Sequence, residues 1–107
     1  MKIVIVGAGS VGTNLYHAFE LKGIKTELVH ARPLTADPSS ARFLPQADVY
    51  IYTVVDSVLA EIVSLVYAPQ ALHLHTSGSM PITVFGADKP HAGVLYFFQS
   101  FSREVLI

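Results

Sequence analysis

A glycine-rich turn directly after the first apolar run most strongly limits what this chain can fold into. Residues 3–6 read Ile-Val-Ile-Val, an uninterrupted β-branched run that is typical of a strand covered on both faces in a parallel sheet. The next six residues, 7–12, read Gly-Ala-Gly-Ser-Val-Gly. Apolar residues then recur at helical spacing from Ser10 to Lys22, and Gly23 stands where a helix commonly ends. The sequence therefore predicts a strand, a tight glycine turn and a helix in direct succession.

The spacing G-x-G-x-x-G has a mechanical meaning at such a strand-to-helix turn. Gly7 permits the tight turn, Gly9 lets the backbone approach a pyrophosphate without an intervening side chain, and Gly12 lets the helix pack closely on the strand. The N-terminus of the helix would present its N–H groups and the positive end of its dipole to the phosphates. The alternative is a glycine turn that serves packing alone. We expect a dinucleotide to contact the turn residues Gly7, Ala8, Gly9, Ser10, Val11 and Gly12.

The rest of the chain alternates short apolar runs with helical patterns. We expect further strands at residues 26–30, 48–55, 71–75 and 94–98. A helix with an apolar stripe follows Asp56, which can cap it. Residues 31–47 contain three prolines and predict a loop with one short helix around residues 39–43, and residues 80–85 predict one or two helical turns. The alternation predicts an α/β protein with a doubly wound parallel sheet, a Rossmann-like dinucleotide-binding domain over residues 1–107.

The end of the second predicted strand indicates which dinucleotide is preferred. NAD-binding domains place an Asp or Glu about 20 residues past the glycine motif, where it holds the ribose 2′-hydroxyl. Here His30, Ala31 and Arg32 stand in that place, and Glu27 lies too early, inside the strand. The Arg32 guanidinium matches a 2′-phosphate in charge and in bidentate geometry, and His30 can add a donor. We therefore expect NADP as the cofactor rather than NAD, the alternative being that Arg32 is a solvated loop arginine.

Ligands of such sheets bind beyond the carboxyl ends of the strands, so the residues that follow each strand are further candidates. The ribose and nicotinamide are expected to contact Thr53, Val54, Val55 and Asp56. For Asp56 we favour the helix cap over a direct ligand contact, and the two roles are compatible. Thr76 and Ser77 follow the next strand in a polar loop, where hydroxyls can face the nicotinamide and polarise a hydride acceptor. Ser77 and His91 are the catalytic candidates. The alternatives are that Ser77 belongs to a plain hydroxyl-rich turn and that His91 is merely an exposed histidine.

Composition and charge argue against several other classes of function. Seven basic and eight acidic residues give a formal net charge of −1 without a basic cluster, which disfavours a nucleic-acid partner. The absence of cysteine excludes disulfides, a cysteine-ligated zinc site and a thiol nucleophile, and is compatible with a cytoplasmic protein. No apolar run approaches the roughly 18 residues of a membrane span. His73 and His75 share one strand face as a conceivable metal pair, but no third ligand is identifiable, so we expect no metal site.

The glycine turn, the triplet His30-Ala31-Arg32, the loop at residues 75–79 (His-Thr-Ser-Gly-Ser) and the segment 91–102 occur in an order that resembles one known family. Together they resemble the N-terminal domain of the Rossmann-like, DUF2520-containing NADP oxidoreductases, which are similar to F420-dependent NADP oxidoreductases and pyrroline-5-carboxylate reductases. The family usually reads Tyr-Pro and then Gln-Thr-Phe-Ser in its last segment, whereas Phe97 and Ser100 replace the proline and the threonine here. The resemblance implies NADP, a small-molecule substrate, and a second, mainly helical domain that closes the active site and drives dimerisation, which these residues do not contain.

Two functions follow from these arguments. The first is the NADP-binding domain of an oxidoreductase that transfers hydride to or from a small imine or carbonyl. The alternative is a non-catalytic NADP-binding sensor or regulatory module, while FAD or S-adenosylmethionine would require an acidic residue near position 30. The chain is 51% hydrophobic and only 14% charged, which is high for a small domain. We therefore expect the apolar segment 94–107 to pack against a missing C-terminal domain or against a partner subunit in a homo-oligomer.

Overall fold

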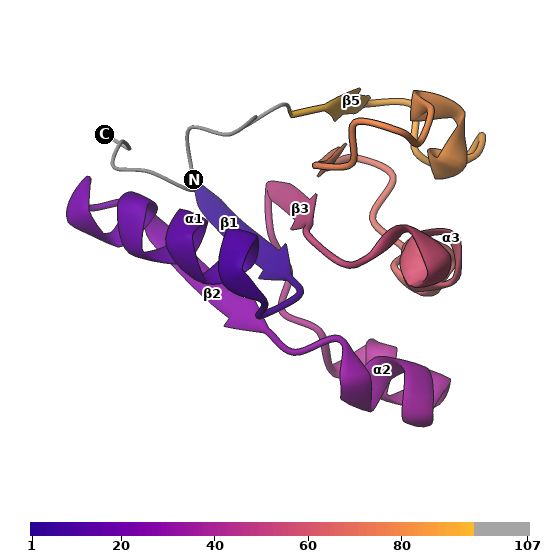
Figure 1. Ribbon diagram of the computed structural model, residues 1–107, viewed down its shortest axis with the longest axis horizontal. Helices are drawn as coiled ribbons and strands as arrows, with labels where there is room; N and C mark the ends of the chain where they lie inside the picture. Colours follow the sequence, from indigo (N-terminus) through magenta and orange to yellow (C-terminus); the bar gives the residue numbers. More distant parts are fainter. Residues whose placement is uncertain (96–107) are drawn as a thin grey trace.

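The computed structural model describes residues 1–95, which form an α/β fold around one five-stranded sheet (Figure 1). The strands are β1 (Lys2–Val6), β2 (Lys25–Val29), β3 (Val49–Tyr52), β4 (Leu72–His75) and β5 (Ala92–Val94). The helices are α1 (Ser10–Leu21), α2 (Arg32–Ala36) and α3 (Asp56–Leu65), and the 3₁₀ helices are η1 (Pro38–Phe43) and η2 (Ile82–Phe85). Within residues 1–95, no helix is long and apolar enough to cross a membrane.

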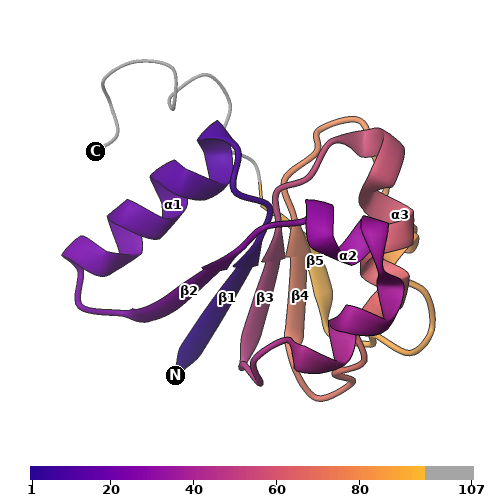
Figure 2. The ribbon, with the colours of Figure 1, turned by 90° about the horizontal axis from the view of Figure 1, so that it is seen from below.

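The strand order places the glycine turn where the winding of the chain reverses. The order is β2-β1-β3-β4-β5, and every neighbouring pair is parallel (Figure 2). From β1 the chain moves to β2 on one side and then crosses back to β3 on the other side. The predicted doubly wound, parallel α/β fold is therefore confirmed. All five strands end at the same edge, and the reversal lies between the ends of β1 and β3, which is where open α/β sheets bind ligands.

The alternation of side chains along β1 explains why both faces of the sheet are covered. Ile3 and Ile5 pack on the side of α1, together with Leu15. Val4 and Val6 pack on the opposite side, in a cluster that includes Tyr50, Tyr52, Leu59, Ile62, Val63 and Phe85. Figure 2 shows α1 on one side of the sheet and α2 and α3 on the other. The four residues of the β-branched run are at most 5% exposed, so its predicted burial on both faces is confirmed.

The crossover between β2 and β3 is more helical than the sequence predicts. The short helix expected around residues 39–43 is present as η1, but the five-residue helix α2 was not predicted. The three prolines suggested a loop, yet Pro33 lies in the first turn of α2, where a missing N–H breaks no helical hydrogen bond. The helix is therefore compatible with the proline that seemed to exclude it.

Three other boundaries refine or correct the predictions. Gly23 has a φ of 75° just after α1, so the predicted helix end is confirmed. Strand β3 ends at Tyr52 rather than at residue 55, because residues 53–55 turn towards α3. The predicted cap at Asp56 is wrong: Val55 is the N-cap of α3, and no side-chain hydrogen bond caps this helix. Strand β5 is found at Ala92–Val94, whereas most of the last predicted strand and the packing of the final apolar segment lie outside the described residues.

Candidate functional site

The glycine turn is hydrogen-bonded to the chain on both sides of β1. The Gly7 N–H donates to the Val29 carbonyl oxygen at 2.8 Å, and the Thr53 N–H donates to the Val6 carbonyl oxygen at 2.9 Å. Gly7 has a φ of 118°, which residues with a side chain rarely adopt. The turn thus begins where the hydrogen bonds of three neighbouring strands end together.

Gly12 brings the first turn of α1 directly onto this backbone. A Cβ on Gly12 would lie 1.9 Å from the Gly7 carbonyl oxygen and 2.6 Å from Thr53 Oγ1, and a Cβ on Gly7 would lie 2.7 Å from the same Oγ1. The Thr53 side chain fills the space between them, and its hydroxyl donates to the Gly7 carbonyl oxygen at 2.7 Å. The predicted tight turn at Gly7 and close packing at Gly12 are therefore confirmed. The sequence did not reveal the part that Thr53 plays in this packing.

Gly9 differs from the other two glycines, because packing does not require it. Its φ of −73° is open to any residue, and a Cβ there would have no atom within 4 Å. It is the N-cap of α1, a position where glycine is common but where only the side chains of Ser, Thr, Asp and Asn cap the helix. Ala8 is half-buried beside it, and the exposed Ser10 and half-buried Val11 begin the helix. The N-terminus of α1 therefore carries neither a capping side chain nor a Cβ that would keep a ligand away.

His30 and Arg32 lie at the end of β2, and both are exposed. Arg32 is the first residue of α2, so its position is fixed by the start of that helix. No carboxylate among residues 1–95 lies within 4.0 Å of the Arg32 guanidinium. Glu27 is instead paired with Lys2 at 3.3 Å, further back along the sheet. The Arg32 guanidinium, which has no acidic neighbour among residues 1–95, thus lies at the same edge of the sheet as the glycine turn.

The loops after β3 and β4 are joined by a hydrogen bond between side chains. The Ser79 hydroxyl donates to Asp56 Oδ2 at 2.5 Å. Hydrogen bonds from Ser79 and then Ser77 hold the pKa of the exposed Asp56 carboxyl below its ordinary value. Val55, beside Asp56, is 68% exposed and offers an apolar surface at the end of β3, and Val54 is half-buried. No sequence pattern singles out Ser79 beyond its place in a hydroxyl-rich loop.

Ser77 and Thr76 are half-buried and already hydrogen-bonded. The Ser77 Oγ accepts the N–H groups of Ser79 and Met80, both at 3.2 Å, and lies 3.2 Å from the Ser79 Oγ. Because Ser79 gives its own proton to Asp56, the single hydroxyl proton of Ser77 has two acceptors nearby, Ser79 Oγ and the Asp56 carboxylate. The Thr76 hydroxyl donates to the Tyr52 carbonyl oxygen at 3.3 Å. Both residues lie at the carboxyl edge of the sheet, as predicted, in a rigid loop.

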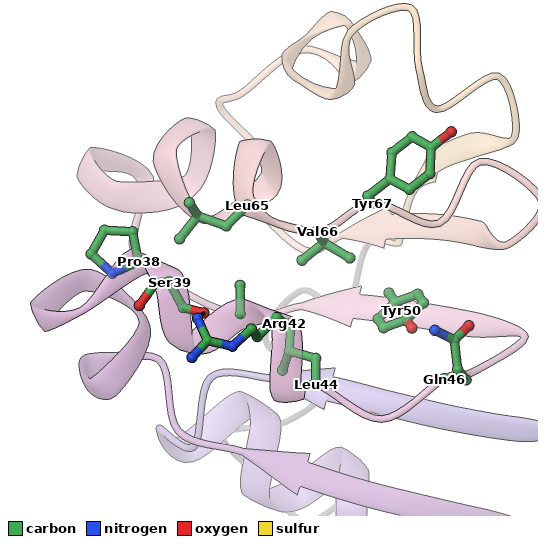
Figure 3. Close-up of a pocket in the computed structure, with 10 residues that line it drawn as sticks. Pro38, Ser39, Arg42, Leu44, Gln46, Tyr50, Leu65, Val66 and Tyr67 are labelled. Carbon is green, nitrogen blue, oxygen red and sulfur yellow. Dashed lines mark hydrogen bonds between the residues drawn. The ribbon is translucent and has the colours of Figure 1, made fainter.

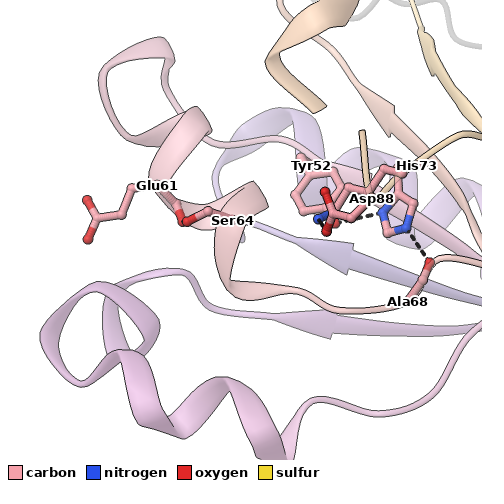
Figure 4. A network of polar contacts seen from close by, with 7 residues as sticks. Tyr52, Glu61, Ser64, Ala68, His73 and Asp88 are labelled. Atoms are coloured by element: carbon pink, nitrogen blue, oxygen red, sulfur yellow. Dashed lines mark hydrogen bonds and ion pairs between the residues drawn. The ribbon is translucent and has the colours of Figure 1, made fainter. Parts of the chain in front are cut away.

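His73 belongs to a buried hydrogen-bond network on the α3 side of the sheet (Figure 4). Its Nε2 donates to the Ala68 carbonyl oxygen at 2.8 Å, so its Nδ1 accepts from the Tyr52 hydroxyl at 2.9 Å. Burial lowers the pKa of His73 below its ordinary value, which favours the neutral ring. The buried Lys89 lies nearby and pairs with Asp88 at 3.1 Å. Both ring nitrogens of His73 are therefore used inside the protein.

His75 is equally engaged, and the idea of a metal-binding histidine pair is wrong. Its Nε2 donates to the Pro81 carbonyl oxygen at 3.3 Å, and its Nδ1 accepts the Ser77 N–H at 3.1 Å. Neither His73 nor His75 has a ring nitrogen left for a metal. Among residues 1–95, no three metal-ligating side chains gather at one place.

His91 lies away from the other candidates, so its predicted position near the substrate is wrong. It directly precedes β5, and its carbonyl oxygen accepts the His73 N–H at 2.8 Å. This places it at the amino edge of the sheet, a full strand length from Ser77 and the glycine turn. His91 lies in the loop before β5, at the N-terminal end of the strand, whereas ligands of such sheets bind beyond the C-terminal ends of the strands.

No protein-family model matches this chain, and no curated protein matches it either. The resemblance to the DUF2520-containing family therefore stays a hypothesis. The fold and the geometry of the site are the observations on which a function can be proposed.

Proposed function

We propose that this chain binds NADP at the glycine turn and is the cofactor-binding domain of an NADP-dependent oxidoreductase. The observation that carries the proposal is Gly9. Packing requires Gly7 and Gly12, whereas Gly9 has an ordinary φ and open space around its Cβ position; an N-cap accepts glycine, but capping alone would favour Ser, Asp or Asn there. A pyrophosphate that approaches the N-terminus of α1 requires that space.

The surrounding residues fit the rest of the cofactor. The first N–H groups of α1 have no partner inside the helix and can donate to phosphate oxygens. Arg32 and His30 stand at the end of β2, where a ribose 2′-phosphate would meet two donors. The exposed Val55 can pack against an apolar ring face, and Asp56 beside it can accept from a ribose hydroxyl.

The chemistry of hydride transfer would come from the bound nicotinamide. The residues of this chain would position the ring and polarise a small imine or carbonyl substrate beside it. Ser77 and Thr76 are the hydroxyls at this edge of the sheet, in a loop that Ser79 and Asp56 hold in place. Either hydroxyl would turn its proton from its present acceptor, the Tyr52 carbonyl oxygen for Thr76 and Ser79 or Asp56 for Ser77, to the developing charge on the substrate, which stabilises the transition state.

Calorimetric titration with NADPH and NADH tests the proposal. The wild-type chain should prefer NADPH, and Arg32→Ala should weaken NADPH binding by tenfold or more, since a hydrogen bond to a charged group contributes about 1.5–3 kcal/mol. NADH binding should not change. Arg42→Ala is the matched control, because it removes the same charge from the same crossover away from the turn. Equal affinities for the two cofactors would refute the preference for NADP, and no binding of either would refute the site.

A regulatory module that binds NADP without turnover is the second candidate. It is favoured by the position of His91, because within residues 1–95 the loops after β3 and β4 then supply hydroxyls and the Asp56 carboxylate as their exposed polar side chains. Screening NADPH oxidation against small imines and carbonyls separates the two functions. Turnover of any substrate supports the oxidoreductase, whereas saturable NADPH binding without turnover supports the module.

A further inference from the structure

A second candidate site lies away from the glycine turn, in a groove of about 540 Å³ (Figure 3). It lies between η1 and the end of α3, and its lining residues include Arg42, Leu44, Gln46, Tyr50, Leu65 and Tyr67. Its volume falls within the range of about 300–1,000 Å³ that small-molecule pockets occupy. The glycine turn contributes no residue to it, so a ligand in this groove would be separate from the proposed cofactor.

The floor of the groove is held rigidly. Tyr50 is 2% exposed, and its hydroxyl donates to the Pro45 carbonyl oxygen at 2.8 Å. Its ring also stacks on His73, with the two ring centroids 5.4 Å apart and the planes 8° from parallel. Leu65 and Tyr67 line the opposite wall (Figure 3), and Tyr67 is 78% exposed. The groove therefore offers a flat, apolar body a preformed place.

Arg42 supplies the charge of the groove. Its guanidinium donates to the Ser39 carbonyl oxygen at 3.2 Å and stacks over the Phe43 ring at 4.7 Å, so its position is fixed from two sides. Among residues 1–95, no carboxylate lies within 4.0 Å of it. A guanidinium has five N–H donors, and most of them remain for a planar anion. Figure 3 shows Arg42 and Ser39 towards one end of the groove and Gln46 towards the other.

We propose that this groove binds an elongated aromatic carboxylate. The carboxylate pairs with Arg42, the ring lies between Leu44 and Leu65 above the buried floor, and a polar substituent at the far end meets the Gln46 amide. A carboxylate fits the planar guanidinium fork in a bidentate manner, and the apolar side chains of Leu44, Leu65 and Val66 favour an organic body over inorganic phosphate. This site is independent of cofactor binding.

The test uses 4-hydroxycinnamate as the probe and its neutral amide as the matched control ligand, with backbone amide NMR spectra of the full chain. We expect shifts at Gln46 and Tyr67, and no shifts in the glycine turn. Arg42→Ala should weaken binding of 4-hydroxycinnamate about tenfold or more, to the level of the neutral amide. Arg32→Ala should leave it unchanged.

Three outcomes would overturn the proposal: no shifts in the groove at millimolar probe, equal binding of the acid and the amide, or unchanged affinity in Arg42→Ala. A further control separates this site from the proposed cofactor site. Saturating NADPH should not displace 4-hydroxycinnamate, and the Arg42→Ala chain should still bind NADPH like the wild type. The proposal for one site can therefore be refuted while the proposal for the other is supported.

Discussion

Two alanine substitutions three residues apart, Gly9→Ala and Gly12→Ala, separate cofactor binding from packing at the glycine turn. Both replace a glycine whose φ is compatible with alanine, so both reduce the freedom of the unfolded chain by the same amount. Only the surroundings of the added methyl group differ. It would meet open space at Gly9, and at Gly12 it would lie 1.9 Å from the Gly7 carbonyl oxygen.

The cost at Gly12 follows from this contact. Real Cβ atoms essentially never approach another atom closer than 3.0 Å, so α1 would have to move away from β1 by an ångström or so. Overpacking of this kind costs about 1–3 kcal/mol, and loss of the hydrogen bond from Thr53 to Gly7 adds about 1 kcal/mol. The helix propensity of alanine offsets about 1 kcal/mol of this. We expect Gly12→Ala to lose about 2 kcal/mol or more, which lowers the melting temperature by about 8–16 °C.

Gly9→Ala should behave in the opposite way. Its free energy of unfolding should stay within about 1 kcal/mol of the wild type, since the methyl group touches nothing and the reduced freedom of the unfolded chain offsets the poorer helix capping of alanine. Its affinity for NADPH should fall by tenfold or more, because the methyl group keeps the phosphates from the first N–H groups of α1. Thermal denaturation and NADPH titration of both variants give the result. Unchanged NADPH affinity in Gly9→Ala would refute the functional interpretation, and a fully stable Gly12→Ala chain would refute the packing argument.

Three further predictions concern the core and the loop after β4. Tyr52→Phe should cost about 1–3 kcal/mol in thermal denaturation, because it leaves the buried His73 Nδ1 without a donor. Since burial lowers the pKa of His73, the unfolded chain binds a proton on this ring more readily than the folded chain. Melting temperatures should therefore be highest above about pH 6.5 and fall as the pH drops below it, and the absence of such a fall would contradict the burial of the ring. In Ser79→Ala, an NMR titration should show the pKa of Asp56 rising towards its ordinary value, and an unchanged pKa would mean that the hydrogen bond is absent.

The fold was predictable because its signals are local and agree with one another. The run of β-branched residues, the glycines and the helical periodicity after Ser10 each predict one part of the same β–turn–α unit, and the later strands repeat the pattern. What misled the prediction was Pro33. A proline breaks a helix in its interior but is compatible with its first turn, and the composition of residues 31–47 does not show which applies.

The site was predictable only where the backbone alone determines it. The glycine turn and the position of Arg32 follow from their distance along the chain from a strand end. Thr53 and Ser79 act through contacts with Gly7 and Asp56, more than 20 residues away in the sequence, and no local pattern encodes such partners. Sequence reasoning likewise read His73 as a possible ligand, because the Tyr52 hydroxyl that occupies its ring nitrogen lies on a neighbouring strand.

Pro38 separates the two arginines of the crossover between β2 and β3, so that Arg32 lies in α2 and Arg42 in η1. Asp37 precedes it and is held out of the helical region, with φ −141° and ψ 88°, so α2 ends after five residues and the chain restarts as η1. A continuous crossover helix would lie beside α3 along the sheet and fill the space over Tyr50. The break sets Arg42 beside the groove, while Arg32, which precedes the break, stays at the carboxyl edge of the sheet because it begins α2. The two arginines are thus held by different helices, and each proposed site can bind its ligand or fail without the other.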